Sequence, residues 1–304
     1  MRQHLPTTKF GGMCLFLGEL AAARDHLEQG IAYDEAQTER SLASRYGFDP
    51  RVPCRAFRAY TLWLLGYPDQ AVQQREAALA LAQELSHPYT AAIARYVATA
   101  VAQFCRDGHS AQERAEALMW LSTEQKFTIF LAWGTILRGW ALAERGQREE
   151  GIAHIREGLT ICRAGGTELR WPYWLALLAE AYGPSGKAED VLPLLAEALA
   201  AMDKTAECFW AAEIYRLKGE VLLRQAIPDA PQAESCLLYA LDVAGHQQAK
   251  SLELRAAMSL ARLWQCQGKR AAAYDLLAPI YGWFTEGFDT ADLQEAKTLL
   301  DALA

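Results

Sequence analysis

The sequence predicts an all-α fold, an α-solenoid in which about seven helix-turn-helix pairs stack as a right-handed superhelix. The first observation behind this prediction is a turn signal that recurs about every forty residues. The turns fall at Gly18, Gly66, Cys105, Gly146, Gly186, Pro228 and Gly268, with spacings of 48, 39, 41, 40, 42 and 40 residues. Fixed periods of this length are typical of solenoid proteins.

The second observation is a small residue at a fixed distance on each side of the turns. Twelve residues after the first six turns stand Gly30, Ala78, Ala117, Gly158, Ala198 and Ala240. Before the turns stand Gly11, Ala59, Ala98, Gly139, Ala179, Gly219 and Ala261, all seven residues ahead except Gly219, which is nine ahead. Small side chains let two helix backbones approach closely. Each turn is therefore expected to join two tightly packed helices.

The elements follow from this register. The helix pairs are expected at 5–37, 51–86, 88–125, 127–165, 169–204, 206–247 and 249–285. The first repeat, 1–37, has hardly any polar sequence ahead of it, so we expect it to be truncated or frayed. A loop over 38–50 follows, then six repeats over 51–285. Asp289 can cap a last helix within 286–304 that covers the final pair. We expect one solenoid domain over residues 1–304.

Composition excludes several classes of function. The 304-residue chain has a net charge of −7 and no cluster of five Lys or Arg residues, which argues against nucleic acid as a partner. Every apolar run of membrane-spanning length contains a charge, which argues against a membrane. The seven cysteines form no CxxC pair and no metal spacing with histidine, so we expect buried thiols, a cytoplasmic protein and neither metal nor cofactor.

The segment Leu137–Gly146 resembles the tetratricopeptide repeat (TPR) in its longer, forty-residue form. Several other segments are similar to the C-terminal TPR region of bacterial signalling proteins. In those proteins a class III adenylate/guanylate cyclase domain and an AAA-type ATPase precede the repeats. These segments are Leu27–Asp34, Leu62–Ala71, Ala132–Ala141, Ala249–Ala257 and Tyr281–Thr290. The resemblance covers nearly the whole chain, and it implies a sensor or partner-binding region without catalytic residues.

In TPR folds the concave groove is lined by the first helix of each pair. Applied here, that rule selects Tyr60, Trp63, Arg95, Gln103, Trp133, Trp140, Tyr173, Glu180, Arg216, Glu220, Arg255 and Arg262. Aromatic rings suit apolar or sugar groups, and arginines suit carboxylates or phosphates. The alternative is that the tryptophans pack between helices and Arg216 pairs with Glu213 or Glu220. The groove hypothesis expects Arg95→Ala, Arg216→Ala and Arg262→Ala to abolish ligand binding at nearly unchanged melting temperature.

The sequence therefore favours a non-catalytic TPR module that binds a peptide, a protein partner or a small effector in its concave groove. The resemblance implies that it regulates a bacterial signalling ATPase or nucleotide cyclase, whose catalytic domains would be partners within the same longer polypeptide. A free-standing TPR scaffold and an enzyme built on a helical solenoid are the alternatives.

Overall fold

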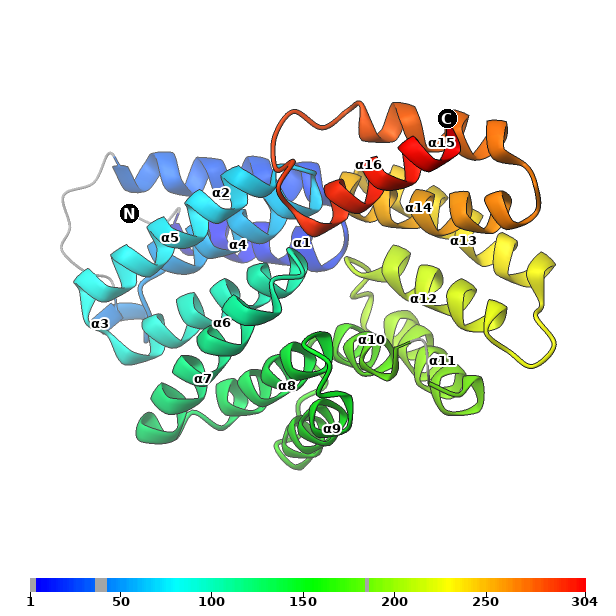
Figure 1. Cartoon of the computed structure of the whole chain (residues 1–304). Coiled ribbons are helices and arrows are strands. Elements are labelled where there is room, and N and C mark those ends of the chain that lie inside the picture. The colour runs from blue at the N-terminus through cyan, green and yellow to red at the C-terminus, as the bar shows by residue number, and fades with distance from the viewer. Residues whose placement is uncertain (1–3, 36–42, 184–185) are drawn as a thin grey trace. The chain divides into compact units, whose positions relative to one another are not determined.

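The computed structural model describes residues 4–35, 43–183 and 186–304, and in that part of the chain all regular structure is helical (Figure 1). The helices are α1 (His4–Phe16), α2 (Leu20–Glu35), α3 (Ala43–Tyr46), α4 (Arg51–Leu64), α5 (Pro68–Leu85), α6 (Pro88–Phe104), α7 (Gly108–Gln125), α8 (Thr128–Glu144), α9 (Arg148–Ala164), α10 (Trp171–Tyr182), α11 (Ala188–Thr205), α12 (Ala211–Leu223), α13 (Ala230–Gln247), α14 (Lys250–Cys266), α15 (Arg270–Tyr281) and α16 (Ala291–Leu303). None of these helices is both long and apolar enough to cross a bilayer.

The chain divides into two compact units, which are described separately. Unit 1 comprises Met1–Trp63 and Pro68–Leu169, and unit 2 comprises Leu64–Tyr67 and Arg170–Ala304. In unit 1 the helices from α5 to α9 each pack against the next helix along the chain, as α1 does against α2, and in unit 2 the helices from α10 to α16 do the same.

The predicted helix pairs and the final helix are confirmed, with boundaries within a few residues of those expected. Two details differ. The N-cap of α16 is Thr290 rather than Asp289, and its hydroxyl donates to the carbonyl of Gly287. Of the loop expected over 38–50, residues 38–42 lie outside the described residues, and the remainder contains the short helix α3.

Glycine ends the first helix of several pairs because the turn needs a left-handed backbone conformation. Gly18, Gly66, Gly146 and Gly268 have φ between 78° and 91°, a region that glycine enters at little cost. The third pair lacks this glycine, and Arg106 takes the left-handed conformation there with φ of 57°. The turn predicted at Cys105 is therefore completed by its neighbour.

Contact between backbones explains the small residues on each side of the turns. A Cβ atom added to Gly139 on α8 would lie 2.6 Å from the carbonyl oxygen of Gly151 on α9. One added to Gly158 on α9 would lie 2.7 Å from the carbonyl oxygen of Ala132. Only a hydrogen atom fits at these positions, so α8 and α9 touch through their main chains.

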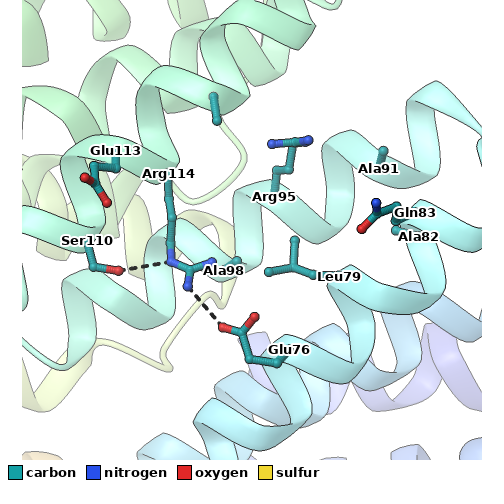
Figure 2. Close-up of a pocket in the computed structure, with 11 residues that line it drawn as sticks. Glu76, Leu79, Ala82, Gln83, Ala91, Arg95, Ala98, Ser110, Glu113 and Arg114 are labelled. Atoms are coloured by element: carbon teal, nitrogen blue, oxygen red, sulfur yellow. Dashed lines mark hydrogen bonds and ion pairs between the residues drawn. The ribbon is translucent and has the colours of Figure 1, made fainter.

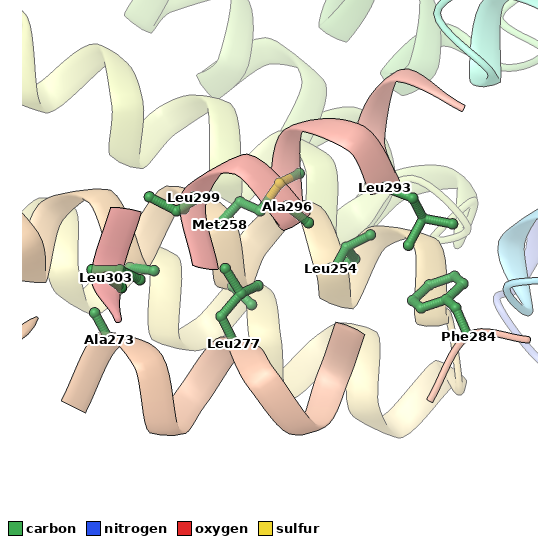
Figure 3. Close-up of a cluster of buried hydrophobic side chains, with 11 residues drawn as sticks. Leu254, Met258, Ala273, Leu277, Phe284, Leu293, Ala296, Leu299 and Leu303 are labelled. Atoms are coloured by element: carbon green, nitrogen blue, oxygen red, sulfur yellow. The ribbon is translucent and has the colours of Figure 1, made fainter. Parts of the chain in front are cut away.

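The last helix covers the C-terminal pair, as expected. Leu293, Ala296, Leu299 and Leu303 of α16 are at most 8% exposed and pack with Leu254 of α14 and other apolar residues of α14 and α15 (Figure 3). The first helix of unit 1 differs, because Phe10 and Met13 of α1 and Leu17, which directly follows it, form an exposed apolar stripe. Their spacing of three and four residues places them on one helix face.

Substituting the glycines tests the close packing of α8 on α9. We expect Gly139→Ala to lower the free energy of unfolding by about 2 kcal/mol or more, because the new methyl group would overlap backbone atoms of Gly151. The measurement is urea denaturation followed by circular dichroism. The matched control is Gly245→Ala in α13, where a Cβ meets nothing within 4 Å. That change should raise stability by up to about 1 kcal/mol through helix propensity. Equal effects of the two substitutions would contradict the packing argument.

Candidate functional site

Unit 1 contains a pocket of about 560 Å³ between α5, α6 and α7 (Figure 2). Helix α6 forms its floor with Ala91, Arg95 and Ala98, which lie on one helix face because they are four and three residues apart. The walls come from α5 and α7 and are formed by Glu76, Leu79, Ala82, Gln83, Ser110, Glu113, Arg114 and Ala117. Pockets of this volume suit small ligands.

The position of this pocket corrects the placement expected for Arg95. A groove lined by first helices alone was expected, whereas α5 and α7 are the second helices of consecutive pairs. Arg95 therefore faces a pocket between second helices. Its side chain is exposed and makes no hydrogen bond or ion pair with any residue in the described part of the chain.

The wall of the pocket holds a chain of polar contacts around one carboxylate. Arg114 donates from Nη2 to Oε1 of Glu76 at 3.0 Å and from Nε to the hydroxyl of Ser110 at 3.0 Å. Nε of Arg75 donates to the same Glu76 oxygen at 2.8 Å. Burial lowers the pKa of Arg114, and the neighbouring positive charge of Arg75 lowers it further. Two guanidinium groups thus share one carboxylate.

The other predicted site residues of unit 1 lie in the core. At most 5% of the surface is exposed for each of Tyr60, Trp63, Gln103, Trp133 and Trp140. The hydroxyl groups of Tyr60 and Tyr96 lie 2.8 Å apart, and the ring of Trp133 lies 4.7 Å from that of Tyr96. Trp63 packs on Phe104 with ring centres 4.9 Å apart. These side chains therefore pack between helices, as the alternative hypothesis expected, and they are not exposed to a ligand.

The predicted aromatic residue of unit 2 is also covered. Tyr173 is fully buried on α10, with its ring centre 4.7 Å from that of Trp174 and 5.2 Å from that of Trp210. The aromatic residues beside the small positions meet side chains of the neighbouring helix pair, and this contact removes them from solvent.

The predicted charged residues of unit 2 do come together, in a network along the first helices. Arg216 of α12 donates to both carboxylate oxygens of Glu213, at 2.7 and 2.9 Å, and to Glu220 one turn later. Burial acts against the charge of Arg216, but the charges of Glu213, Glu220 and, more weakly, Glu180 of α10 raise its pKa well above the ordinary value. The side chain of Glu213 is only 1% exposed, so its negative charge depends on the guanidinium of Arg216.

Arg255 of α14 extends the network to the last helix. It is 5% exposed, and its Nε donates to Oδ2 of Asp292 on α16 at 2.8 Å. Its Nη1 lies 3.9 Å from Oε1 of Glu213 on α12. Arg262, two turns further along α14, pairs with Glu295 at 2.6 Å, and both side chains are about 40% exposed. No spacing in the sequence marks Asp292 and Glu295 as site residues, because only the packing of α16 brings them beside α14.

These contacts change one expectation from the sequence. The groove hypothesis expected Arg216→Ala to leave melting nearly unchanged, but the substitution would leave the buried carboxylate of Glu213 without its closest cation. Breaking a buried pair in this way is strongly destabilising. Near-neutral effects on melting are expected only for Arg95→Ala and Arg262→Ala, whose side chains are exposed or nearly half exposed.

The cysteines were expected to be buried thiols, and this is correct only in part. All seven are thiols rather than disulfides, but Cys266 is exposed and Cys14, Cys105 and Cys208 are partly exposed. Burial raises the pKa of Cys162 to about 11, which makes its thiol a poor nucleophile at neutral pH.

No known protein-family profile matches the chain. A protein of Rhizobium meliloti (strain 1021), described as uncharacterized, is 26% identical over 250 residues, which cover 81% of this chain and 24% of that protein. The chain therefore spans about a quarter of the length of this relative.

Solved helical-repeat structures are similar in fold. A Rap protein complexed with Competence and Sporulation Factor has a TM-score of 0.66 and 10% identity, and the match covers 99% of this chain and 76% of that chain. The apo form of RapI has a TM-score of 0.59 and 11% identity, with 98% and 99% covered. Yeast Tom70 has a TM-score of 0.52 and 12% identity, with 93% and 60% covered. At these identities the likeness shows a shared TPR-like helical-repeat fold.

Two arginines on α14 give a matched test of the charged network. We expect Arg255→Ala to cost about 3–5 kcal/mol in the free energy of unfolding, because Glu213 and Asp292 lose a cation in a buried setting. Arg262→Ala should cost less than about 1 kcal/mol, because its pair with Glu295 is exposed. Both values are measured by urea denaturation. Adding Asp292→Asn to Arg255→Ala should recover part of the loss, because the carboxylate that Arg255 binds at 2.8 Å is then neutral. Similar losses for the two arginines, or no recovery, would contradict the network.

Proposed function

We propose that this chain is a non-catalytic TPR-like interaction module that binds a peptide or protein partner through charged side chains on its first helices. The observation that carries the proposal is a charged row in unit 2, formed by Arg216 and Glu220 on α12, Arg224 at the C-cap of α12 and Arg262 on α14. Arg216 is mostly covered, whereas Glu220, Arg224 and Arg262 are between 23% and 40% exposed.

Ion pairs hold this charged row in place before any ligand arrives. Arg224 donates to Glu220 at 2.9 Å and to the carbonyl oxygen of Gly183 at 3.0 Å, while Glu220 also accepts from Ser259 of α14 at 2.8 Å. Groups that are already ordered lose less conformational entropy on binding. A row with both signs of charge favours a partner with a complementary order of charges, which gives specificity.

We also propose that the two units form one repeat domain, and that this domain is the sensor region of a bacterial, cytoplasmic signalling ATPase or nucleotide cyclase. The resemblance of the sequence to such C-terminal regions supports this context, as does the match to about a quarter of a much longer Rhizobium protein. The Rap structure with a bound Competence and Sporulation Factor supports effector binding by a fold of this kind. Regulation would require the effector to bind one state of the whole protein more tightly than the other.

Selection from a library of twelve-residue peptides tests the charged row. We expect the wild-type chain to enrich peptides that bind with micromolar affinity or better, measured by fluorescence anisotropy. The double variant Arg224→Glu with Arg262→Glu should bind them at least about 10-fold more weakly, because two exposed cations of the row become anions.

Lys204→Glu, on the second helix α11 of the same unit, is the control for the reversal of a cation elsewhere on the surface. It is exposed and lies outside the charged row, so its peptide affinity should stay within about 2-fold of wild type. The proposal is wrong if the double variant binds like this control while both remain folded by circular dichroism.

The signalling context is tested separately in source cells. An antibody raised against this chain should detect a protein several times larger than 304 residues accounts for, because ATPase or cyclase domains would share the polypeptide. Detection by immunoblot of a protein of only this size would contradict the context. The peptide-binding proposal would be unaffected by that result.

A further inference from the structure

We propose that the pocket between α5, α6 and α7 is a second binding site, which takes a small ligand through one anionic group, a carboxylate or a phosphate, held by Arg95. The inference goes beyond peptide binding by the charged row, because the pocket lies in unit 1 and the row lies in unit 2.

The pairing of first-helix arginines in unit 1 sets Arg95 apart. Arg58 on α4 donates to Glu28 of α2 at 3.1 Å, and Arg138 on α8 donates to Glu116 of α7 at 3.2 Å. Each of these arginines thus uses a carboxylate on the second helix of the preceding pair. Arg95 lies on α6, the first helix between them, and has no such carboxylate among the residues that the structure describes.

The reason is that the available carboxylate is already used. Glu76 is the glutamate that α5 contributes to the pocket, and it is shared by Arg75 and Arg114. Glu113, on the α7 wall, lies 3.2 Å from Nε2 of His109. Figure 2 shows the contacts running from Glu76 through Arg114 to Ser110, with the Arg95 guanidinium outside them. The guanidinium of Arg95 therefore has no carboxylate paired with it among the residues that the structure describes.

The charge balance of the pocket favours an anion. The lining carries the guanidinium groups of Arg95 and Arg114 and the carboxylates of Glu76 and Glu113, and Arg75, which binds Glu76 from outside the lining, adds a third guanidinium group. A guanidinium can bind a carboxylate or a phosphate with two parallel hydrogen bonds.

The remaining lining determines what else the ligand carries. Leu79 and the alanines of the floor and walls give an apolar surface without large side chains, namely Ala82, Ala91, Ala98 and Ala117. At about 560 Å³ the pocket accommodates a small molecule with a short apolar group beside the anion. The ligand class is thus a short-chain organic acid or an organic phosphate monoester.

The experiment uses pentanoate, butyl phosphate and uncharged pentanamide as probes. Each is titrated into the whole chain while the Nε–H signals of arginine are followed by NMR. We expect saturable shifts of the Arg95 signal with at least one anion at about 10 mM or below, and none with pentanamide. Binding of pentanoate alone would identify a carboxylate ligand, and binding of butyl phosphate alone would identify a phosphate ligand.

The variants then assign the site. Arg95→Gln should weaken binding of the anion, measured by calorimetry, at least about 10-fold without changing the fold, because the side chain is exposed. Arg156→Gln, at an exposed arginine of α9 in the same unit, should bind like wild type. No saturation with either anion, or unchanged binding by Arg95→Gln, would overturn the inference. Peptide binding by Arg95→Gln stays intact if the charged row is a separate site, so the two proposals can fail independently.

Discussion

Main-chain contact within the helix pairs is the constraint on which the rest of this structure depends. At Gly139, Gly151 and Gly158 the backbones of α8 and α9 touch, and at Gly219 a Cβ would lie 3.1 Å from the carbonyl oxygen of Ala233 on α13. An interface this close between two helices leaves no room for large side chains. The tryptophans and tyrosines of the first helices must therefore pack elsewhere, and consecutive pairs bury them between each other.

This burial decides which side chains are left for binding. Trp133, Trp140 and Tyr173 are buried in the core and do not reach solvent, whereas charged side chains of the first helices do. A charged side chain that lies next to the core needs a group of opposite charge beside it. In unit 2 the carboxylate of Glu213 pairs with Arg216, and the carboxylate of Asp292 pairs with Arg255. A buried network of this kind adds little net stability compared with an apolar core, but it fixes the positions of the exposed charges beside it.

The sequence predicted what depends on local spacing. The pairs, the turns and the covering helix α16 follow from small residues and apolar periodicity along one segment. It could not predict that Tyr60 is buried, because the neighbouring helix pair determines whether a side chain of a first helix reaches solvent. It also gave no sign that Ser86, Lys126, Ala206 and Gln248, just after second helices, take left-handed conformations with φ between 51° and 59°. Glycine would have marked those ends, and none stands there.

The pocket around Arg95 shows why such a site escapes a reading of spacing alone. Its walls come from α5 and α7, which are distant in sequence from each other. Its positive charge arises because Arg95 lacks a paired carboxylate among the residues that the structure describes, and no sequence motif marks that feature. Arg58 and Arg138 are occupied by glutamates, so a ligand anion would have to displace a carboxylate from either of them. Arg95 requires no such exchange, and a new anion gains the full charge-assisted hydrogen bonds. In a repeat protein a binding site can thus arise where one repeat loses an ion pair that its neighbours keep.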